Sequence, residues 1–145
     1  MFRYSTLILL FALPLFAPAQ TARQASAVDK SKHRVVIQLT SSDTLVHRAL
    51  VKQIRNVQAA APNTAIEVVC HNNGIDFLQI SRTKCSADIE QLKKSGVDFV
   101  ACENTMQTRQ LKREDLLSAC RLVPAGVVEI IVKQEKGWAY IKAGF

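Results

Sequence analysis

Cysteine is the residue type through which this chain could most readily do chemistry. The four thiols belong to Cys70, Cys85, Cys102 and Cys120. No Cys-x-x-Cys pair occurs, so the spacing predicts neither a zinc ribbon nor a thioredoxin-type redox motif. Cys102 follows an apolar, β-branched run and precedes Asn104 and Thr105, which can cap a helix. A thiol placed there faces backbone N–H groups that favour the thiolate, although cysteine is also a common small core residue.

A second group of candidate residues follows the run 65–70. Cys70 ends that run, and His71, Asn72 and Gly74 lie in the turn after it. If the two strands are neighbours, Cys70 could approach Cys102, as a disulfide partner, a resolving thiol or only a packing residue. His71 could act as a base or orient an anion, and a loop histidine with no such role stays open. The three histidines are scattered and predict no metal site.

Runs of strand character alternate with segments of helical spacing, which is the pattern of a parallel sheet covered by helices on both faces. The predicted strands are 33–40, 65–70, 97–101, 121–123 and 138–142. The predicted helices are 46–57, 75–80, 86–95, 105–110, 113–118 and 127–136. The last one is rich in valine and isoleucine, and its length between two glycines favours a helix. Such sheets bind ligands beyond the carboxyl ends of their strands, which is where Cys102 and His71 are expected.

The amino-terminal residues have the layout of a secretory signal peptide. Arg3 precedes an apolar run over 7–16, and small residues end at Ala19. We therefore expect a signal peptide over 1–19, a flexible polar leader over 20–32 and one domain over 33–145. The apolar run is short for a bilayer span of ~20 residues, so no stable membrane insertion is expected after cleavage. Export across the inner membrane predicts a periplasmic protein.

The basic character of the chain does not predict nucleic-acid binding. The formal net charge is +7, but lysines and arginines are interspersed with acids, and aromatic residues make up only 6%. A nucleic-acid site favours a concentrated basic face with aromatics for stacking. Neither a phosphate-binding loop nor a dinucleotide glycine motif is present.

Four segments together resemble the DsrE/DsrF-like proteins. They are 33–40, 96–106 around Cys102, 123–130 and 134–142. The resemblance implies a three-layer α/β/α domain with a five-stranded parallel sheet that tends to form homo-oligomers. It also implies that sulfur is carried as a persulfide on Cys102 and passed between partner proteins, without a metal or organic cofactor. Many relatives have a glycine-rich turn where this chain has 71–74, of which Gly74 is the one glycine.

Three hypotheses for function follow. The first is a sulfur-relay protein with persulfide on Cys102, at most a sulfurtransferase-like carrier, served by a sulfur donor or acceptor protein. The second is a non-catalytic, homo-oligomeric module that binds a small ligand or a protein in the periplasm, with Cys102 as packing. The third is a thiol redox protein that pairs Cys102 with Cys70.

Overall fold

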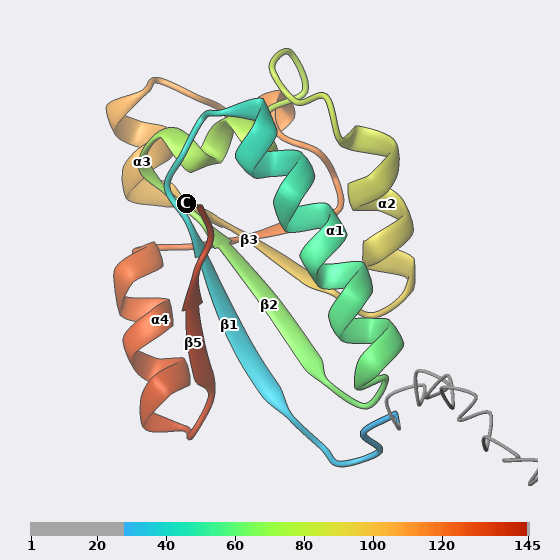
Figure 1. Ribbon diagram of the computed structural model, residues 1–145. Helices are drawn as coiled ribbons and strands as arrows, with labels where there is room; N and C mark the ends of the chain where they lie inside the picture. The colour runs from blue at the N-terminus through green and yellow to red at the C-terminus, as the bar shows by residue number, and fades with distance from the viewer. Residues whose placement is uncertain (1–27, 145) are drawn as a thin grey trace, which may run out of the picture.

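The strands form one five-stranded, all-parallel sheet in the computed structural model, which describes residues 28–144 (Figure 1). The strands are β1 (Arg34–Leu39), β2 (Ala65–Cys70), β3 (Asp98–Cys102), β4 (Cys120–Val123) and β5 (Ala139–Lys142). Their order across the sheet is β4-β3-β2-β1-β5. The parallel sheet with helices between its strands confirms the predicted α/β class. The predicted signal peptide and most of the predicted leader lie outside the described residues.

Helices connect successive strands as the alternating pattern predicts. They are α1 (Thr44–Ala60), the 3₁₀ helix η1 (Asn72–Phe77), α2 (Ser86–Lys94), α3 (Glu103–Thr108), the 3₁₀ helix η2 (Arg113–Asp115) and α4 (Gly126–Glu135). The valine- and isoleucine-rich segment after Gly126 is a helix, as its length and context indicate. Helix α3 starts two residues earlier than predicted, because Cys102 itself occupies the N-cap position.

Helices α1 and α2 cover one face of the sheet, and α4 covers the other (Figure 1). The larger core lies beneath α1 and α2 and includes Leu50, Ile54, Phe77 and Phe99. The smaller core lies beneath α4 and consists of Val36, Val69, Val100, Val123 and Ile130. Because successive strand residues point to opposite faces, sheets buried on both sides have nearly continuous apolar strands. That is why β2 and β3 are largely apolar, with Glu67 and Asp98 as their charged residues.

A network of charged side chains fixes α4 on the sheet. Glu67 of β2 is 1% exposed, and its Oε2 accepts hydrogen bonds from Arg121 Nη2 at 3.0 Å and from Lys133 Nζ. Arg121 also donates to Glu129 Oε1 at 2.7 Å and to Asp98 Oδ2 at 2.7 Å. Burial raises the pKa of the Glu67 carboxyl, and the two cations oppose that rise. These bonds join β2, β3 and β4 to the middle of α4, and so set the position of its first turn.

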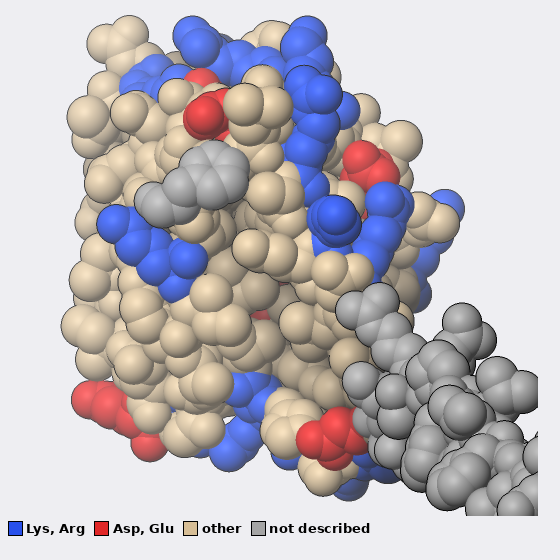
Figure 2. Space-filling model, viewed as in Figure 1, with Lys and Arg blue, Asp and Glu red and all other residues tan. Residues whose placement is uncertain are grey.

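Residues 28–32, the described part of the predicted leader, lie against the carboxyl end of α1. The Asp29 N–H donates to Ala60 O at 2.8 Å, and Asn63 Nδ2 donates to Lys30 O at 2.7 Å. None of the helices within 28–144 has the length and apolar character needed to cross a membrane. On the face seen in Figure 2, lysine and arginine side chains occur in several separate groups with acids between them.

Candidate functional site beside Cys102

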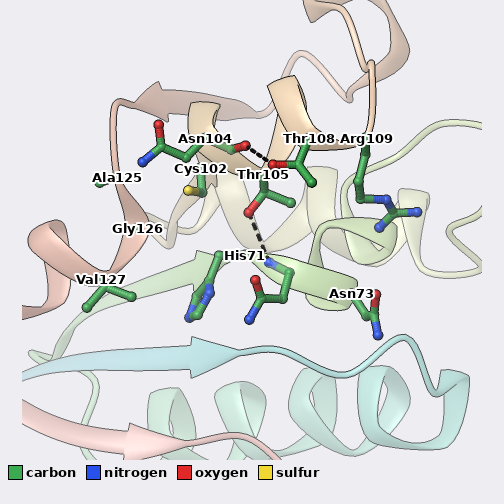
Figure 3. A pocket seen from close by; sticks show the side chains of 11 residues that line it. His71, Asn73, Cys102, Asn104, Thr105, Thr108, Arg109, Ala125, Gly126 and Val127 are labelled. Atoms are coloured by element: carbon green, nitrogen blue, oxygen red, sulfur yellow. Dashed lines mark hydrogen bonds between the residues drawn. The ribbon is translucent and has the colours of Figure 1, made fainter.

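A cavity of about 570 Å³ opens at the carboxyl end of the sheet (Figure 3). Three chain segments line it: the turn after β2 (71–73), the end of β3 with α3 (from 102 to 109), and the turn into α4 (125–127). These are the segments that follow three neighbouring parallel strands. The cavity therefore lies where the topology of an open parallel sheet predicts a ligand site.

Cys102 lies in the wall of this cavity, where β3 ends and α3 begins. It is 5% exposed, and burial alone would raise the pKa of its thiol. The N–H of Gly126, the hydroxyl and N–H of Thr105 and the N–H of Asn104 hydrogen-bond to the sulfur and lower its pKa. The net result is a pKa below the ordinary value of a thiol. Hydrogen bonds to the charged form explain this direction, because they stabilise thiolate over thiol.

The hydroxyl of Thr105 is oriented toward the sulfur by a second hydrogen bond. The Asn72 N–H donates to Thr105 Oγ1 at 3.0 Å (Figure 3). Because that N–H occupies a lone pair of the oxygen, the hydroxyl proton is free to be donated to Cys102. Asn72 adopts a left-handed backbone conformation, with φ of 51°, where the chain enters η1. The turn after β2 thus contributes to the thiolate through Thr105.

Gly126 lets α4 approach the thiol closely. A Cβ at this position would lie 3.1 Å from Val69 Cγ1 and 3.3 Å from the Cβ atoms of both Cys102 and His71. The space for a side chain is therefore already filled by the two neighbouring strand ends. The Asn104 N–H also donates to Pro124 O at 3.2 Å, which ties the start of α3 to the turn before α4. Both helix starts are consequently fixed around one sulfur atom.

His71 is the titratable neighbour of the thiol, and burial lowers the pKa of its imidazole, although a hydrogen bond with the Asn72 side chain opposes this. Gln38 Nε2 donates to His71 Nε2 at 2.7 Å, and the Tyr140 hydroxyl donates to Gln38 Oε1. This chain of bonds keeps the Nε2 atom an acceptor, which is the state of a neutral ring. His71 therefore brings hydrogen-bonding capacity to the cavity without a fixed charge.

Five of the seven candidate residues from the sequence meet in the cavity: Cys102, His71, Asn72, Asn104 and Thr105. Cys70 does not line it. The strand alternation that points Val69 and His71 toward α4 sends the Cys70 side chain into the core beneath α1 and α2. Cys70 and Cys102 thus lie on opposite faces of the sheet, which argues against their pairing as a redox couple.

Gly74 also lies outside the cavity lining, and its role is structural. A Cβ there would lie 2.0 Å from Leu39 O, so η1 packs directly on the backbone at the end of β1. Gly74 N–H donates to His71 O at 3.0 Å and closes the turn that carries His71 and Asn72. Its contribution to the site is therefore the position of that turn.

Sequence reasoning missed six residues that line the cavity: Asn73, Thr108, Arg109, Ala125, Gly126 and Val127. The turn into α4 had a usable signal, because Pro124 marks the end of a parallel strand next to that of Cys102. Arg109 had a weaker one, namely its position one short helix beyond Cys102. Neither the inward direction of its side chain nor the close approach of Gly126 follows from a linear pattern.

The other three thiols differ from Cys102 in their environment. All four cysteines are free and buried, and burial raises the pKa of Cys70, Cys85 and Cys120. Only at Cys102 do hydrogen bonds outweigh burial. Within residues 28–144, no three His, Cys, Asp or Glu side chains gather as a metal site.

Several solved structures are similar to this chain. A protein of unknown function from Methanobacterium thermoautotrophicum is 33% identical, with a TM-score of 0.74 over 77% of this chain and 99% of its own. The ychN protein from E. coli is 11% identical, with a TM-score of 0.59 over 77% and 99% of the two chains. A conserved protein of unknown function from Bacteroides thetaiotaomicron is 11% identical, with a TM-score of 0.58 over 75% and 93%. At that identity the last two show the fold alone.

Among curated protein sequences no relative matches this chain. The model of the DsrE/DsrF-like family matches residues 45–143, from the first turn of α1 to just past β5, and so includes Cys102 with its cavity. This family is associated with sulfur relay. The parallel sheet, the 33% identical neighbour and the family match agree, and the chain belongs to the DsrE/DsrF-like family.

Proposed function

We propose that this protein carries sulfur as a persulfide on Cys102. The observation that carries the proposal is the set of donors around its sulfur, from the first turns of α3 and α4, which lower the pKa of a buried thiol. A hydrophobe that only fills space needs no such donors. The cavity beside the sulfur gives a small donor molecule access to it. The association of the family with sulfur relay supports the same chemistry.

The transfer is a pair of displacement steps at sulfur. The Cys102 thiolate attacks the terminal sulfur of a donor persulfide, the S–S bond of the donor breaks, and the donor leaves as a thiolate. Cys102 then holds the transferred sulfur as Cys–S–SH. An acceptor thiolate attacks this outer sulfur, and Cys102 leaves again as a thiolate. No external electrons are needed, because the transferred sulfur keeps its oxidation state.

A lowered thiol pKa assists both steps of this relay. It increases the fraction of thiolate available for attack, and it makes Cys102 a better leaving group when the sulfur is passed on. The same hydrogen bonds would stabilise the thiolate that Cys102 becomes again when the acceptor takes the sulfur. In this proposal the hydrogen-bond donors of the site stabilise the thiolate, and the transfer needs no metal or organic cofactor.

The assembly and location of the protein belong to the same proposal. Val127, Val128 and Ile131 of α4 are 53%, 55% and 48% exposed, and apolar side chains grouped on one helix are typical of interfaces. They support a homo-oligomer that exchanges sulfur with a donor or acceptor protein. The signal peptide expected over 1–19 supports a periplasmic location for this exchange.

Sulfur loading tests the function directly. We expect the purified protein, reduced and then treated with inorganic polysulfide, to gain the mass of one sulfur atom in intact-mass spectrometry. Cys102→Ser should gain none, while Cys85→Ser, which removes another buried thiol, should load as the unmodified protein does. Peptide mapping should place the added sulfur on Cys102.

The contradicting outcome is equally clear. A protein whose Cys102 is shown to be a free thiol, yet gains no sulfur from polysulfide, is not a persulfide carrier. That result would favour the binding module, in which the cavity holds a ligand without chemistry.

A further inference from the structure

Arg109 is the one lysine or arginine among the residues that line the cavity. It follows α3 directly, and its side chain is 25% exposed. Its Nη2 lies 2.6 Å from Asp76 Oδ1, which holds the guanidinium in place at the edge of the cavity. Asp76 is 7% exposed, at the end of η1 that is packed into the core.

This ion pair does not neutralise the cation. Asp76 Oδ2 also contacts Arg82 Nη1 at 3.4 Å, so two guanidinium groups share a single carboxylate. No aspartate or glutamate is among the residues that line the cavity, and His71 is held neutral. The cavity therefore has an excess of positive charge at Arg109, together with the side-chain amide groups of Asn73 and Asn104. It suits an anion.

The cation and the reactive sulfur lie apart. Figure 3 shows the Cys102 thiol and the Arg109 guanidinium apart from each other, with Thr105 and Thr108 of α3 between them. Seven helical residues rise about 10 Å, which sets the scale of that separation. A cavity of 570 Å³ is of the size that holds a small organic molecule. A ligand that meets both groups must carry its anionic group several bonds from its reactive sulfur.

We propose that the cavity binds a low-molecular-weight thiol persulfide that bears a carboxylate, with the carboxylate on Arg109 and the terminal sulfur at Cys102. This inference rests on the proposed function and names its donor class. Asp76 already occupies Nη2, whereas Nη1 has no hydrogen-bond partner, so the carboxylate would take a charge-assisted contact from the guanidinium N–H groups that Asp76 leaves. Thiosulfate is too compact to bridge the two groups, since its charged oxygens are bonded to the atom next to its terminal sulfur.

Matched sulfur donors test the assignment. The rate of Cys102 loading is measured by intact mass with glutathione persulfide, its diethyl ester persulfide, thiosulfate and inorganic polysulfide. The unmodified protein should load from glutathione persulfide about tenfold faster than from the diethyl ester, which keeps the amino group and lacks both carboxylates, the effect of one charge-assisted contact. Arg109→Gln should abolish this preference, and Arg109→Lys should retain part of it. Lys112→Gln should leave it unchanged, because Lys112 is a nearby cation that is exposed and does not line the cavity.

Loading from inorganic polysulfide separates a failure of the Arg109 assignment from a failure of the proposed carrier function. Equal loading from glutathione persulfide and its ester, with polysulfide also active, would overturn the Arg109 assignment and leave the carrier function standing. Preference retained in Arg109→Gln, or thiosulfate loading as fast as glutathione persulfide, would overturn it as well. Failure of all four donors, polysulfide included, would instead overturn the proposed function on which the assignment rests.

Discussion

The Gly74→Ala variant is expected to lose at least about 3 kcal/mol of unfolding free energy, measured by urea denaturation. A Cβ at this position would lie 2.0 Å from Leu39 O, 2.5 Å from Leu39 C and 2.9 Å from Thr40 N. All three are backbone atoms at the end of β1, so no side-chain rotation can relieve the overlap. A domain of this size has a stability of about 5–15 kcal/mol, so the loss is a large part of it.

Gly96→Ala is the matched control for this variant. Gly96 has a φ of 95°, which strains any other residue, but a Cβ there would meet nothing within 4 Å. Its cost should stay near 1–2 kcal/mol, the ordinary penalty of a left-handed backbone for a non-glycine residue. If Gly74→Ala were as stable as Gly96→Ala, the tight contact between η1 and the end of β1 would be disproved.

Gly74→Ala should also affect the candidate site. Gly74 N–H bonds to His71 O, and the turn it closes places the Asn72 N–H on the Thr105 hydroxyl. Displacement of η1 would weaken this chain of contacts to Cys102. The part of the Gly74→Ala protein that remains folded should therefore react more slowly at Cys102 with a thiol probe than the unmodified protein does.

Thr105→Val is expected to lower the rate of Cys102 alkylation at neutral pH about fivefold. Valine keeps the shape of threonine and removes the hydroxyl that donates to the sulfur. A hydrogen bond to a charged group contributes about 1.5–3 kcal/mol, so less thiolate is present without it. The remaining thiolate is more basic and therefore a better nucleophile. With a Brønsted slope of about 0.4–0.5, this recovers roughly half of the loss on a logarithmic scale of rate. Iodoacetamide labelling followed by peptide mapping measures the rate at Cys102 alone.

Thr105→Ser separates this electrostatic role from packing. Serine keeps the hydroxyl that accepts from the Asn72 N–H and donates to Cys102, but it lacks the methyl group. It should therefore restore most of the rate and leave the pH at half-maximal rate close to that of the unmodified protein. An equal loss of rate in both variants, with no change in the pH profile, would show that Thr105 only packs.

The strand ends could be predicted because the apolar runs and their polar boundaries are local. These local signals place five candidate residues at the carboxyl end of the sheet: Cys102, His71, Asn72, Asn104 and Thr105. The prediction did not hold for Cys70. It considered only that the ends of neighbouring strands lie close together, and left out that successive side chains of a strand point to opposite faces of the sheet. Cys70 pairs with Ala101 in the ladder, and both point into the core away from Cys102.

The remainder of the site depends on packing between segments far apart in the sequence. Gly126 can approach Cys102 closely because it lacks a Cβ, which would lie only 3.1 Å from Val69 Cγ1 and 3.3 Å from His71 Cβ, and this is visible only with all three segments in place. The position of α4 in turn depends on Glu67, a charged residue inside an apolar strand that a linear pattern cannot pair with Arg121 and Lys133. Arg109 likewise needs Asp76 to hold it at the cavity.

The most direct test of the central claim is the pH dependence of alkylation at Cys102, compared between the folded protein and the same protein unfolded in urea. The hydrogen bonds from Gly126, Thr105 and Asn104 predict that half-maximal rate is reached at a lower pH in the folded state. Cys70, Cys85 and Cys120 should become reactive only on unfolding, because burial raises their pKa. A folded-state midpoint at or above the unfolded one would contradict the claim that this site stabilises the Cys102 thiolate.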